Sequence, residues 1–432
     1  MKMNRLTSWI LVAMVLGIIV GYACNTMASP EVAKEIAGYF GMVTDIFLRM
    51  IKMIIAPLVF ATLVAGLANM GDGKTVGRIG GRALMWFIGA SLASLTIGLI
   101  AANLLHPGSG IGVALPEAGT ATNLKTGALN LKDFITHVFP KSIVESMAGN
   151  SILQILVFAV FFGVALGHLH NQTARSLVAT MDDIVHVMLK VTDYVMRVAP
   201  LGVFAAVAGA ITTQGVGMLT VFGKFMLCFY LALAVLWAVL ILAGYMVLGR
   251  EVFSLLKLVR TPMLIGFSTA SSESVYPKLM EQLEKFGVSN RVTGFVLPLG
   301  YSFNLDGSMI YTSFAALFVA QAYGIEMSLT SQITMLLVLM VSSKGIAGVP
   351  RSSLVVVAAV LPMFGLPEAG VLLILGIDHF LDMGRTATNV MGNAIATAVV
   401  AKWEGAIEPV DPALAESDDA IPAPGELVPQ AA

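Results

Sequence analysis

Long apolar stretches alternate with polar connections along residues 1–249. A helix that crosses a membrane needs about 20 apolar residues. Stretches of this kind predict spanning helices over residues 7–27, 40–70, 80–105, 150–169, 193–213 and 217–249. The 40–70 stretch is longer than one crossing requires, so we expect it to tilt or to extend beyond the bilayer. Residues 106–149 form a polar, glycine-rich connection, and residues 172–192 are typical of the solvated start of the next helix.

From residue 250 onward the apolar pieces become short. They cover residues 251–267, 292–303, 308–323, 333–343 and 350–364, and three polar segments interrupt them: STASSES, NLDGS and SSKGIAGVP. Irregular backbone at membrane depth is tolerated only where it is buried in protein or lines a cavity. STASSES and SSKGIAGVP predict the tips of two re-entrant hairpins, and NLDGS predicts a break inside a membrane-crossing helix. A last long segment, 367–402, follows, which indicates an internal repeat of hairpin plus helix.

Composition places the whole chain in a membrane. Of its 432 residues, 57% are hydrophobic and 12% are charged, whereas soluble domains carry about 25% charged residues. We therefore expect an all-α polytopic membrane protein that binds no nucleic acid. The two cysteines, Cys24 and Cys228, form neither a disulfide framework nor a metal-ligand pattern. Because no nucleotide-binding or nucleophile motif is present either, we expect neither an enzyme nor a bound cofactor.

Positive charge predicts the orientation. Lys and Arg gather near residues 2–5, 74–82, 250–260 and 278–291, which places these sites on the cytoplasmic side. The start of the chain could be a signal peptide, but Tyr22 makes a poor cleavage site, so we read residues 7–27 as the first spanning helix. Residues 405–432 are acidic and rich in proline and alanine, which predicts a disordered cytoplasmic tail. We divide the chain into helices 1–6 (1–249), a transport core (250–404) and this tail, with both termini cytoplasmic.

The last helix carries a polar stripe. Asp378, Asp382, Arg385, Asn389 and Asn393 follow one another at spacings of 4, 3, 4 and 4 residues, which puts them on one helical face. Such a stripe must face a cavity or other helices, as a binding face or as a buried structural network. Arg385 offers a planar fork to a carboxylate, and Asp382, one turn away, can hold an ammonium group. Together they indicate an acidic amino acid.

The three interrupting segments carry further candidates. A helix broken between Asn304 and Gly307 presents backbone carbonyls and the carboxylate of Asp306, which suits a monovalent cation or a proton; a satisfied glycine kink is the alternative. The serine-rich first tip opens a short helix and could bind an anion, or it could be an ordinary polar turn. Glu273 in this tip is a candidate proton carrier, the alternative being a solvated glutamate. The second tip has the glycine content of a mobile gate, formed by Gly345, Pro350 and Arg351.

SSES, NLDGS, GIAGVP and LDMGRTATNVMGN occur in this order at spacings that resemble the dicarboxylate/amino acid:cation symporters. That family includes an archaeal sodium–aspartate transporter, mammalian glutamate transporters and bacterial proton–glutamate carriers. The resemblance covers nearly the whole chain and is most specific over residues 250–404. It implies eight transmembrane helices plus two re-entrant hairpins, inverted repeats, a homotrimer in the bacterial cytoplasmic (inner) membrane, and an elevator-type motion.

The resemblance also implies roles for individual residues. Arg385 should bind the substrate's side-chain carboxylate and Asp382 its amino group. The remaining substrate contacts fall on Thr386, Asn389, Ser271, Ser272, Ser308 and the backbone near Gly348. The cation or proton is expected at Asp306, Asn304, Gly300, Asn393 and Glu273. Members that carry plain C4-dicarboxylates have a Ser-Glu-Ala-Arg run where this chain has DMGR, so the resemblance favours an amino acid.

Departures from the family pattern concern the cation. Leu305 replaces a methionine of sodium-coupled members, Asn393 replaces an aspartate that binds sodium, and Phe87, Ala90 and Ser91 stand where a further sodium site has Tyr and Thr-Ser. These losses favour co-transported protons, as in the bacterial carriers.

Alternatives to that interpretation are a sodium-coupled carrier, with Na⁺ at Asp306 and Asn304, and a proton-coupled C4-dicarboxylate carrier. Thr312 replaces the glutamate that mammalian members protonate, so the proton must bind elsewhere. Ala270 replaces an arginine of the archaeal member, and Arg351 is the candidate to compensate for it.

Overall fold

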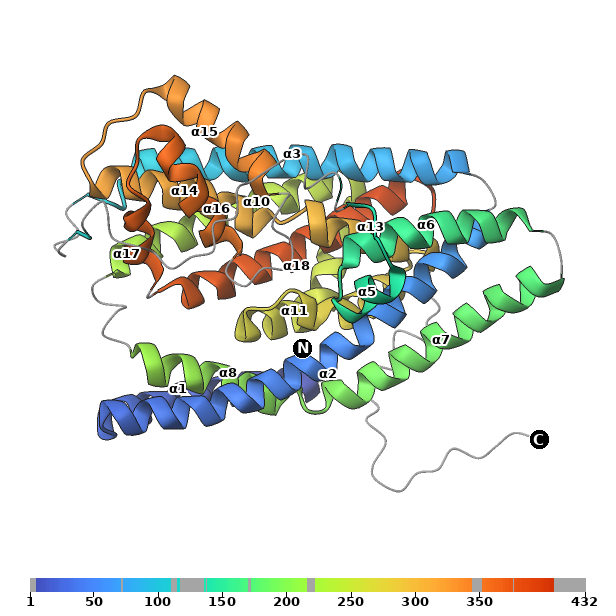
Figure 1. The fold of residues 1–432 in the computed structure, drawn as a ribbon, viewed down its shortest axis with the longest axis horizontal. Coiled ribbons are helices and arrows are strands. Elements are labelled where there is room, and N and C mark those ends of the chain that lie inside the picture. The colour runs from blue at the N-terminus through green and yellow to red at the C-terminus, as the bar shows by residue number, and fades with distance from the viewer. Residues whose placement is uncertain are drawn as a thin grey trace.

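All named elements of the protein are helices. The computed structural model describes residues 5–70, 73–109, 115–116, 136, 138–169, 172–215, 222–343, 352–375 and 377–407. Within these ranges no strand occurs, and one isolated antiparallel bridge joins Val288 to Ile407. The all-α prediction is therefore confirmed (Figure 1).

One group of helices comes from the first half of the chain. It contains α1 (Arg5–Met27), α2 (Pro30–Met70), α5 (Ile143–Ala148), α6 (Ile152–His168), α7 (Gln172–Met196) and α8 (Ala199–Gln214). Helix α1 lies along α8, and α2 contacts α6, α7 and α8 (Figure 1). The α1–α8 contact is close because Gly21 has no side chain: a Cβ there would lie 2.7 Å from the carbonyl oxygen of Ala208.

Two predictions for this group need correction. Helix α2 begins at Pro30, ten residues before the predicted start at residue 40. The predicted helix over 193–213 is two helices, α7 and α8, which meet at an angle of 52°. Pro200 in the first turn of α8 explains the break, because proline has no N–H to donate and its ring excludes the preceding helical turn.

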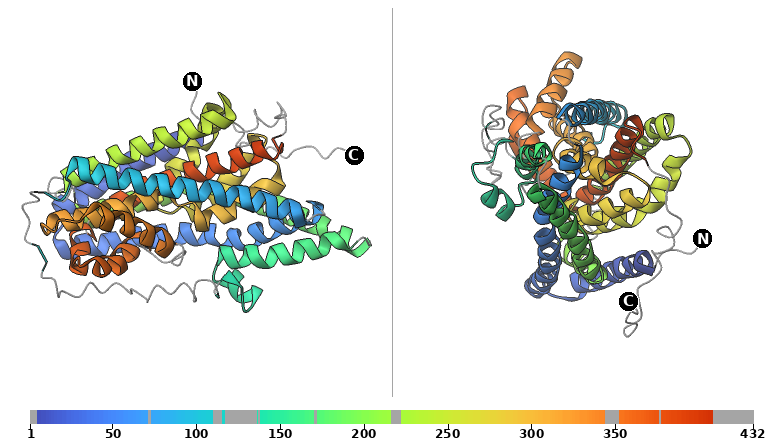
Figure 2. Two further views of the ribbon diagram at one scale, coloured as in Figure 1. Left: turned by 90° about the horizontal axis from the view of Figure 1, so that it is seen from above. Right: turned by 90° about the vertical axis from the view of Figure 1, so that its right-hand side faces the viewer.

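A second group surrounds the C-terminal helix α18 (Asp378–Trp403). Helix α3 (Gly73–Leu105) lies along α14 (Asp306–Ala322), and α10 (Gly223–Leu248) lies along α18. Figure 2 shows α3 extending along most of the length of the molecule. Although α3 and α10 belong to residues 1–249, they therefore pack mainly on elements from the C-terminal part of the chain.

The first predicted hairpin is present. It consists of α11 (Glu251–Thr269), the 3₁₀ turn η1 (Glu273–Val275) and α12 (Tyr276–Lys285), and we call it hairpin 1. Helix α11 ends where Ala270 adopts a left-handed conformation, with φ of 49°. This conformation is unfavourable for alanine because of its Cβ atom, so the turn beside the serines is strained.

Of the second hairpin the structure describes the two arms. These are α15 (Leu329–Ser342) and α16 (Ser352–Val360), which continues into η3 (Leu361–Phe364). The tip between them, with Gly345, Gly348, Pro350 and Arg351, lies outside the described residues.

The break in NLDGS is confirmed. Helix α13 (Asn290–Phe303) ends immediately before Asn304, and α14 begins at Asp306. The predicted continuous segment 367–402 is wrong, because it consists of η4 (Glu368–Gly370), α17 (Val371–Leu375) and α18. Helix α18 begins at Asp378, where a carboxylate in the first turn is favoured by the helix dipole.

Five of the described helices are long and apolar enough to cross a membrane, namely α1, α2, α3, α10 and α11, and the bent pair α7–α8 makes a sixth. The protein is a multi-pass membrane protein. Helices α13 and α14 are each shorter than one crossing because a polar break separates them, and α18 carries the polar stripe. The predicted total of eight spans stays a prediction, and residues 408–432 of the predicted tail lie outside the described part.

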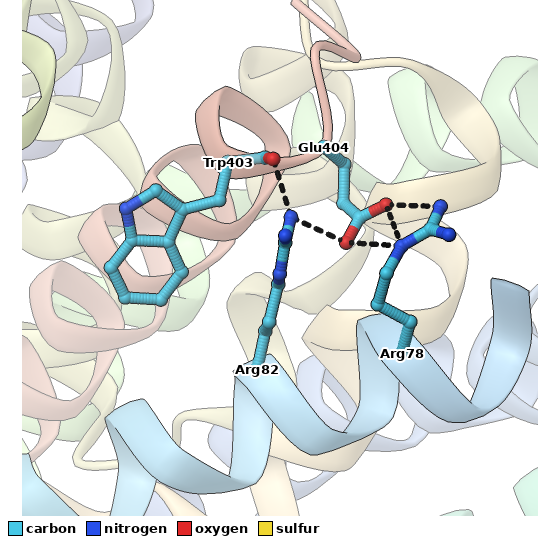
Figure 3. Close-up of polar contacts among 4 residues, drawn as sticks. All are labelled: Arg78, Arg82, Trp403 and Glu404. Atoms are coloured by element: carbon cyan, nitrogen blue, oxygen red, sulfur yellow. Dashed lines mark hydrogen bonds and ion pairs between the residues drawn. The ribbon is translucent and has the colours of Figure 1, made fainter.

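Ion pairs join the C-terminal end of α18 to the N-terminal half of α3. Figure 3 shows the Glu404 carboxylate between two arginines, with Arg78 Nη2 at 2.9 Å and Arg82 Nη1 at 2.8 Å. Arg82 also donates to the carbonyl oxygen of Trp403. The Glu404 side chain is only 3% exposed, so these two arginines are what makes its burial tolerable.

Candidate functional site

Arg385 lies at the centre of the polar stripe on α18. Its Nη2 atom is 2.9 Å from Asp382 Oδ1 and 3.2 Å from Asp378 Oδ1. The side chains of Arg385 and Asp378 are 1% and 2% exposed, whereas Asp382 is 31% exposed. The predicted shared face is thus confirmed, and one guanidinium is bound to two carboxylates on successive turns.

Tyr311 from α14 supports this arrangement from a second helix. Its hydroxyl group donates to Asp378 Oδ1 at 3.1 Å, and its ring centroid lies 4.0 Å from Arg385 Cζ. A cation over an aromatic face is attracted by the ring quadrupole, more so when both are desolvated. Two further donors of Arg385, Nε and Nη1, are buried and have no hydrogen-bond acceptor among the described residues. Buried donors of this kind are expected to find a partner, and an anionic ligand would supply one.

Asn389 connects the stripe to the start of α14. Its Oδ1 accepts from the backbone N–H of Gly307 at 2.8 Å, and its Nδ2 is 3.4 Å from Ser308 Oγ. Gly307 permits this approach, because a Cβ there would lie 2.7 Å from Arg385 Cα. Three predicted substrate residues, Arg385, Asn389 and Ser308, are therefore brought together by direct contact between α14 and α18.

The predicted cation residues also come together. Asn304 Nδ2 lies 3.4 Å from Asn393 Oδ1, and Asp306 is fully buried beside Gly392, where any Cβ would collide with its carboxylate. Gly300 faces the Asn393 side chain in the same way. Carboxylate, amide and carbonyl oxygens are the ligands that hard monovalent and divalent cations prefer. Among the described residues no group of three or more His, Cys, Asp or Glu is placed to hold a metal ion.

The tip of hairpin 1 is held by its own hydrogen bonds. Ser274 Oγ donates to the carbonyl of Ser271 at 2.7 Å, and Tyr301 from α13 donates to the carbonyl of Ser272 at 2.9 Å. Behind the tip, Thr386 of α18 is buried against Gly266 of α11. The structure therefore fixes the backbone of the two predicted serines and packs hairpin 1 against the helix that carries Arg385.

Glu273 does not stand alone at this tip. Its Oε2 atom lies 3.6 Å from Lys52 Nζ on α2, and the two side chains are 34% and 49% exposed. The ion pair links hairpin 1 to a helix of the first group, and at this exposure both the proton-carrier role of Glu273 and its alternative as a solvated glutamate stay predictions.

Sequence reasoning missed two residues of this region, Tyr311 and Lys52. It placed Asp378 in the stripe but gave it no role of its own. Lys52 interrupts the apolar run MIKMII, and an ionisable residue within a membrane span is a functional candidate by default. No sequence pattern singles out Tyr311, because only the fold brings it next to Arg385.

The buried charged stripe, the broken helix facing it and the re-entrant hairpin define a secondary transporter of the membrane. The sequence profile described as the sodium:dicarboxylate symporter family matches residues 6–403. The chain belongs to this family, which consists of transporters and not of enzymes. The predicted family resemblance is thereby confirmed.

Relatives with two different names are similar to this chain. A C4-dicarboxylate transport protein of Pseudomonas syringae pv. tomato is 42% identical over 405 residues, covering 92% of this chain and 86% of the relative. A protein of the same name from Acinetobacter baylyi is 40% identical, with coverages of 92% and 91%. A proton/sodium-glutamate symport protein of Geobacillus stearothermophilus is 39% identical, with coverages of 92% and 94%. Identity of this size favours neither name over the other.

Proposed function

We propose that the protein imports acidic amino acids, glutamate or aspartate, together with protons. The observation that carries the substrate assignment is the pairing of Asp382 with Arg385 at 2.9 Å in a buried stripe. A guanidinium and a carboxylate on adjacent turns offer one partner to a side-chain carboxylate and one to an ammonium group. Asp382 is the more exposed of the two aspartates on Arg385, so it is the one that an entering amino group would reach.

A C4-dicarboxylate is the second candidate, because relatives of that name are as similar to the chain as the glutamate carriers. Succinate has no ammonium group. It would leave Asp382 next to the bound carboxylates, where like charges repel. The DMGR run of this chain, in place of the Ser-Glu-Ala-Arg run of the family's C4-dicarboxylate carriers, also supports the amino acid.

Symport follows from the charge of the site. The described site holds one guanidinium, Arg385, and three carboxylates, Asp306, Asp378 and Asp382, which gives a formal charge of 1 − 3 = −2. An anionic substrate enters such a site only if cations or protons enter with it, because buried uncompensated charge is strongly unfavourable. The replacements Leu305 and Asn393 favour protons over sodium, with Asp306 and Glu273 as the groups that would carry them.

The same proposal includes the assembly and the motion that the family resemblance implies. The protein would form a homotrimer in the cytoplasmic membrane of a bacterium, with both termini inside. Hairpins 1 and 2 and the last two helices would slide against a scaffold made of early helices. The second tip, with Gly345, Pro350 and Arg351, would act as the gate. If Arg351→Ala leaves substrate affinity unchanged, the proposed compensation for Ala270 is wrong.

Uptake of labelled L-glutamate into proteoliposomes tests the proposal. We expect accumulation against a glutamate gradient under an inward proton gradient without sodium, and none under an inward sodium gradient at equal pH. A strict sodium requirement would mean that Asp306 and Asn304 still build a working sodium site.

Substrate identity is tested in the same vesicles by competition. Asp382→Asn should weaken glutamate binding about 10- to 150-fold relative to succinate binding, the loss expected for a hydrogen bond to a charged group. Asp182→Asn on α7 is the matched control and should change neither substrate. Wild-type uptake that succinate inhibits more strongly than aspartate does would favour the C4-dicarboxylate candidate.

A further inference from the structure

Helix α10 contacts α18 through three residues on one of its faces. They follow one another at spacings of 3 and 4 residues, and we call them the clamp: Tyr230, Leu233 and Trp237. Their partners on α18 are spaced one turn apart: Phe380, Gly384 and Thr388. This part of α18 also carries Asp382 and Arg385, the two side chains on which the proposed substrate assignment depends.

The first clamp contact is a hydrogen bond to the backbone of α18. The Tyr230 hydroxyl donates to the carbonyl oxygen of Phe380 at 2.6 Å. In an α-helix that carbonyl also accepts from the N–H of residue 384, and a carbonyl oxygen has lone pairs for both bonds. The same hydroxyl interacts with the Gly384 N–H and, through space, with the charges of Arg385 and Asp382. Tyr230 is therefore bonded to the helical turn that carries this pair.

Trp237 contacts the same turn through one intermediate residue. Its Nε1 donates to Thr388 Oγ1 at 2.8 Å, and Thr388 Oγ1 donates to the carbonyl oxygen of Gly384 at 2.8 Å. Thr388 is fully buried, and these two bonds fix the orientation of its hydroxyl group. Two side chains of α10 are therefore linked, directly or through Thr388, to backbone carbonyls at the two ends of the turn 380–384.

Close contact between the two helices depends on Gly384, which has no side chain. A Cβ at this position would lie 2.9 Å from Leu233 Cδ1, 2.9 Å from Tyr230 Cε1 and 3.1 Å from Tyr230 Cζ. The end of the leucine side chain can rotate aside, but the tyrosine ring is held by its hydrogen bond to Phe380. Glycine is unfavourable in the interior of a helix, so its presence here indicates that the close approach of α10 is needed.

We propose that Tyr230, Leu233 and Trp237 are positioning residues that hold the Gly384 turn, so that Asp382 and Arg385 meet the substrate at a fixed separation. The inference rests on the proposed function, because it takes these two side chains as the partners of an amino acid's ammonium group and side-chain carboxylate. Apolar packing alone would join α10 to α18 without hydrogen bonds. The two donors from α10 additionally fix where the turn lies along and around the helix axis.

A fixed separation matters because the candidate substrates differ in their own. Glutamate is longer than aspartate by one methylene group, so the two place the side-chain carboxylate at different distances from the ammonium group. A pocket can discriminate between ligands that differ by one methylene group. A shift of Arg385 relative to Asp382 should therefore change the ratio of the affinities for glutamate and aspartate. A contact that only stabilised the helix pair would change the Tm and leave that ratio in place.

Competition binding of glutamate and aspartate to the purified protein in detergent tests the inference. Tyr230→Phe keeps the ring and removes the bond to Phe380, so glutamate affinity should fall about 2- to 13-fold, the net contribution of one hydrogen bond. Aspartate affinity should change by a different factor. Trp237→Phe, which removes the bond to Thr388, should act in the same direction on glutamate and also change the ratio. Tyr245→Phe is the matched control: it removes a hydroxyl group from a side chain of α10 that is 43% exposed, and it should retain both affinities.

A double-mutant cycle tests the contact at Gly384. Gly384→Ala should lower glutamate affinity about 5- to 160-fold, because the turn must move to relieve the overlap of the added Cβ with Tyr230. In a Tyr230→Leu background, which lacks the ring, the same substitution should cost less, as expected for residues that act through direct contact. Gly89→Ala on α3, where an added Cβ would meet no atom within 4 Å, is the matched control and should retain wild-type affinity.

Thermal unfolding of each variant separates positioning from stability. A wild-type glutamate-to-aspartate ratio in either Tyr230→Phe or Trp237→Phe would overturn the inference, whatever the Tm. An equal cost of Gly384→Ala in both backgrounds would also overturn it, and if Gly384→Ala does not fold, the two phenylalanine variants decide. Wild-type protein that binds succinate more tightly than either amino acid would instead overturn the proposed function, and this inference with it. The two failures are distinguishable because the wild-type affinities are compared before any variant is measured.

Discussion

Asp378→Asn is the most informative single change at the site. It removes a charge from a carboxylate that is 3.2 Å from Arg385 Nη2 and accepts the Tyr311 hydroxyl at 3.1 Å. Breaking a buried ion pair by removing one partner costs about 3–5 kcal/mol. Because Asp382 remains 2.9 Å from Arg385, we expect a smaller loss, about 1.5–3 kcal/mol, similar to that of a hydrogen bond to a charged group.

The loss should appear in substrate affinity. An amide at position 378 attracts the guanidinium less strongly than a carboxylate does, so we expect Arg385 to shift toward Asp382 and away from the geometry that Tyr311 supports. We therefore expect binding of glutamate and of succinate to weaken by the same factor, about 10- to 150-fold. This pattern differs from that of Asp382→Asn, which should affect glutamate more than succinate.

Competition binding to purified protein in detergent measures both affinities, and thermal unfolding checks that the variant is folded. Tyr311→Phe is the graded control, because it keeps the ring beneath Arg385 and removes only the hydroxyl, so its effect should be smaller. An Asp378→Asn protein that binds both ligands as tightly as the wild type would refute the view that Asp378 positions Arg385. An Asp378→Asn protein that loses affinity for glutamate but not for succinate would refute the same view.

Three further predictions concern neighbouring regions. Gly392→Ala should abolish coupled uptake, because the added Cβ collides with the Asp306 carboxylate; glutamate accumulation under a proton gradient measures this. Burial raises the pKa of Glu284, at the charged end of α12, to about 7. The folded protein therefore holds the proton on Glu284 more tightly than the unfolded chain does. The free energy of unfolding should fall by about 1–3 kcal/mol as pH rises from about 5 to 8. Thermal unfolding of Glu284→Gln over the same pH range should lack this decline. Glu404→Gln removes the counter-ion that Arg78 and Arg82 share, so the free energy of unfolding should fall by about 1–3 kcal/mol. The measured Tm should therefore fall, and it should fall further than in Arg82→Gln.

The polar stripe could be predicted because helical periodicity alone decides which residues of α18 share a face. The ion-pair partners within the stripe could not be predicted in this way. Both Asp378 and Asp382 lie within reach of Arg385 along the helix, and only the contact with Tyr311 from α14 shows that Asp378 is the buried, fixed partner. A spacing argument treats the two aspartates as equivalent, whereas their exposures of 2% and 31% separate them.

Helix breaks were predicted where polar residues mark them and missed where they do not. NLDGS contains a carboxylate, an amide and a glycine, and α13 and α14 separate there as expected. The segment 367–402 begins with Pro367 and Glu368, which mark η4, but the apolar run 371–375 that follows was read as part of the last helix, so the division into η4, α17 and α18 was missed. The bend between α7 and α8 was missed although Pro200 marks it, because apolarity on both sides was read as one span.

Contacts between distant parts of the chain lie beyond what a pattern can predict. Lys52 and Glu273 are separated by more than two hundred residues, and nothing in the sequence around either one indicates the other as its partner. Their meeting depends on how hairpin 1 sits against α2, which local periodicity does not encode. The same holds for Arg78, Arg82 and Glu404, whose contact fixes α3 to α18 (Figure 3).

If the proposed function holds, substrate choice at this site reduces to an exchange of partners on Arg385. In the structure its single positive charge already faces two carboxylates, those of Asp378 and Asp382, so a carboxylate from solution gains little unless one aspartate is released. An ammonium group on the same molecule gives Asp382 a new partner, and the substrate carboxylate then takes its place on Arg385. A dicarboxylate without an amino group offers no such partner, so it must bind against the charge of Asp382 or with that group protonated. Succinate binding that strengthens on acidification while glutamate binding does not would therefore identify Asp382 as the residue that sets this preference.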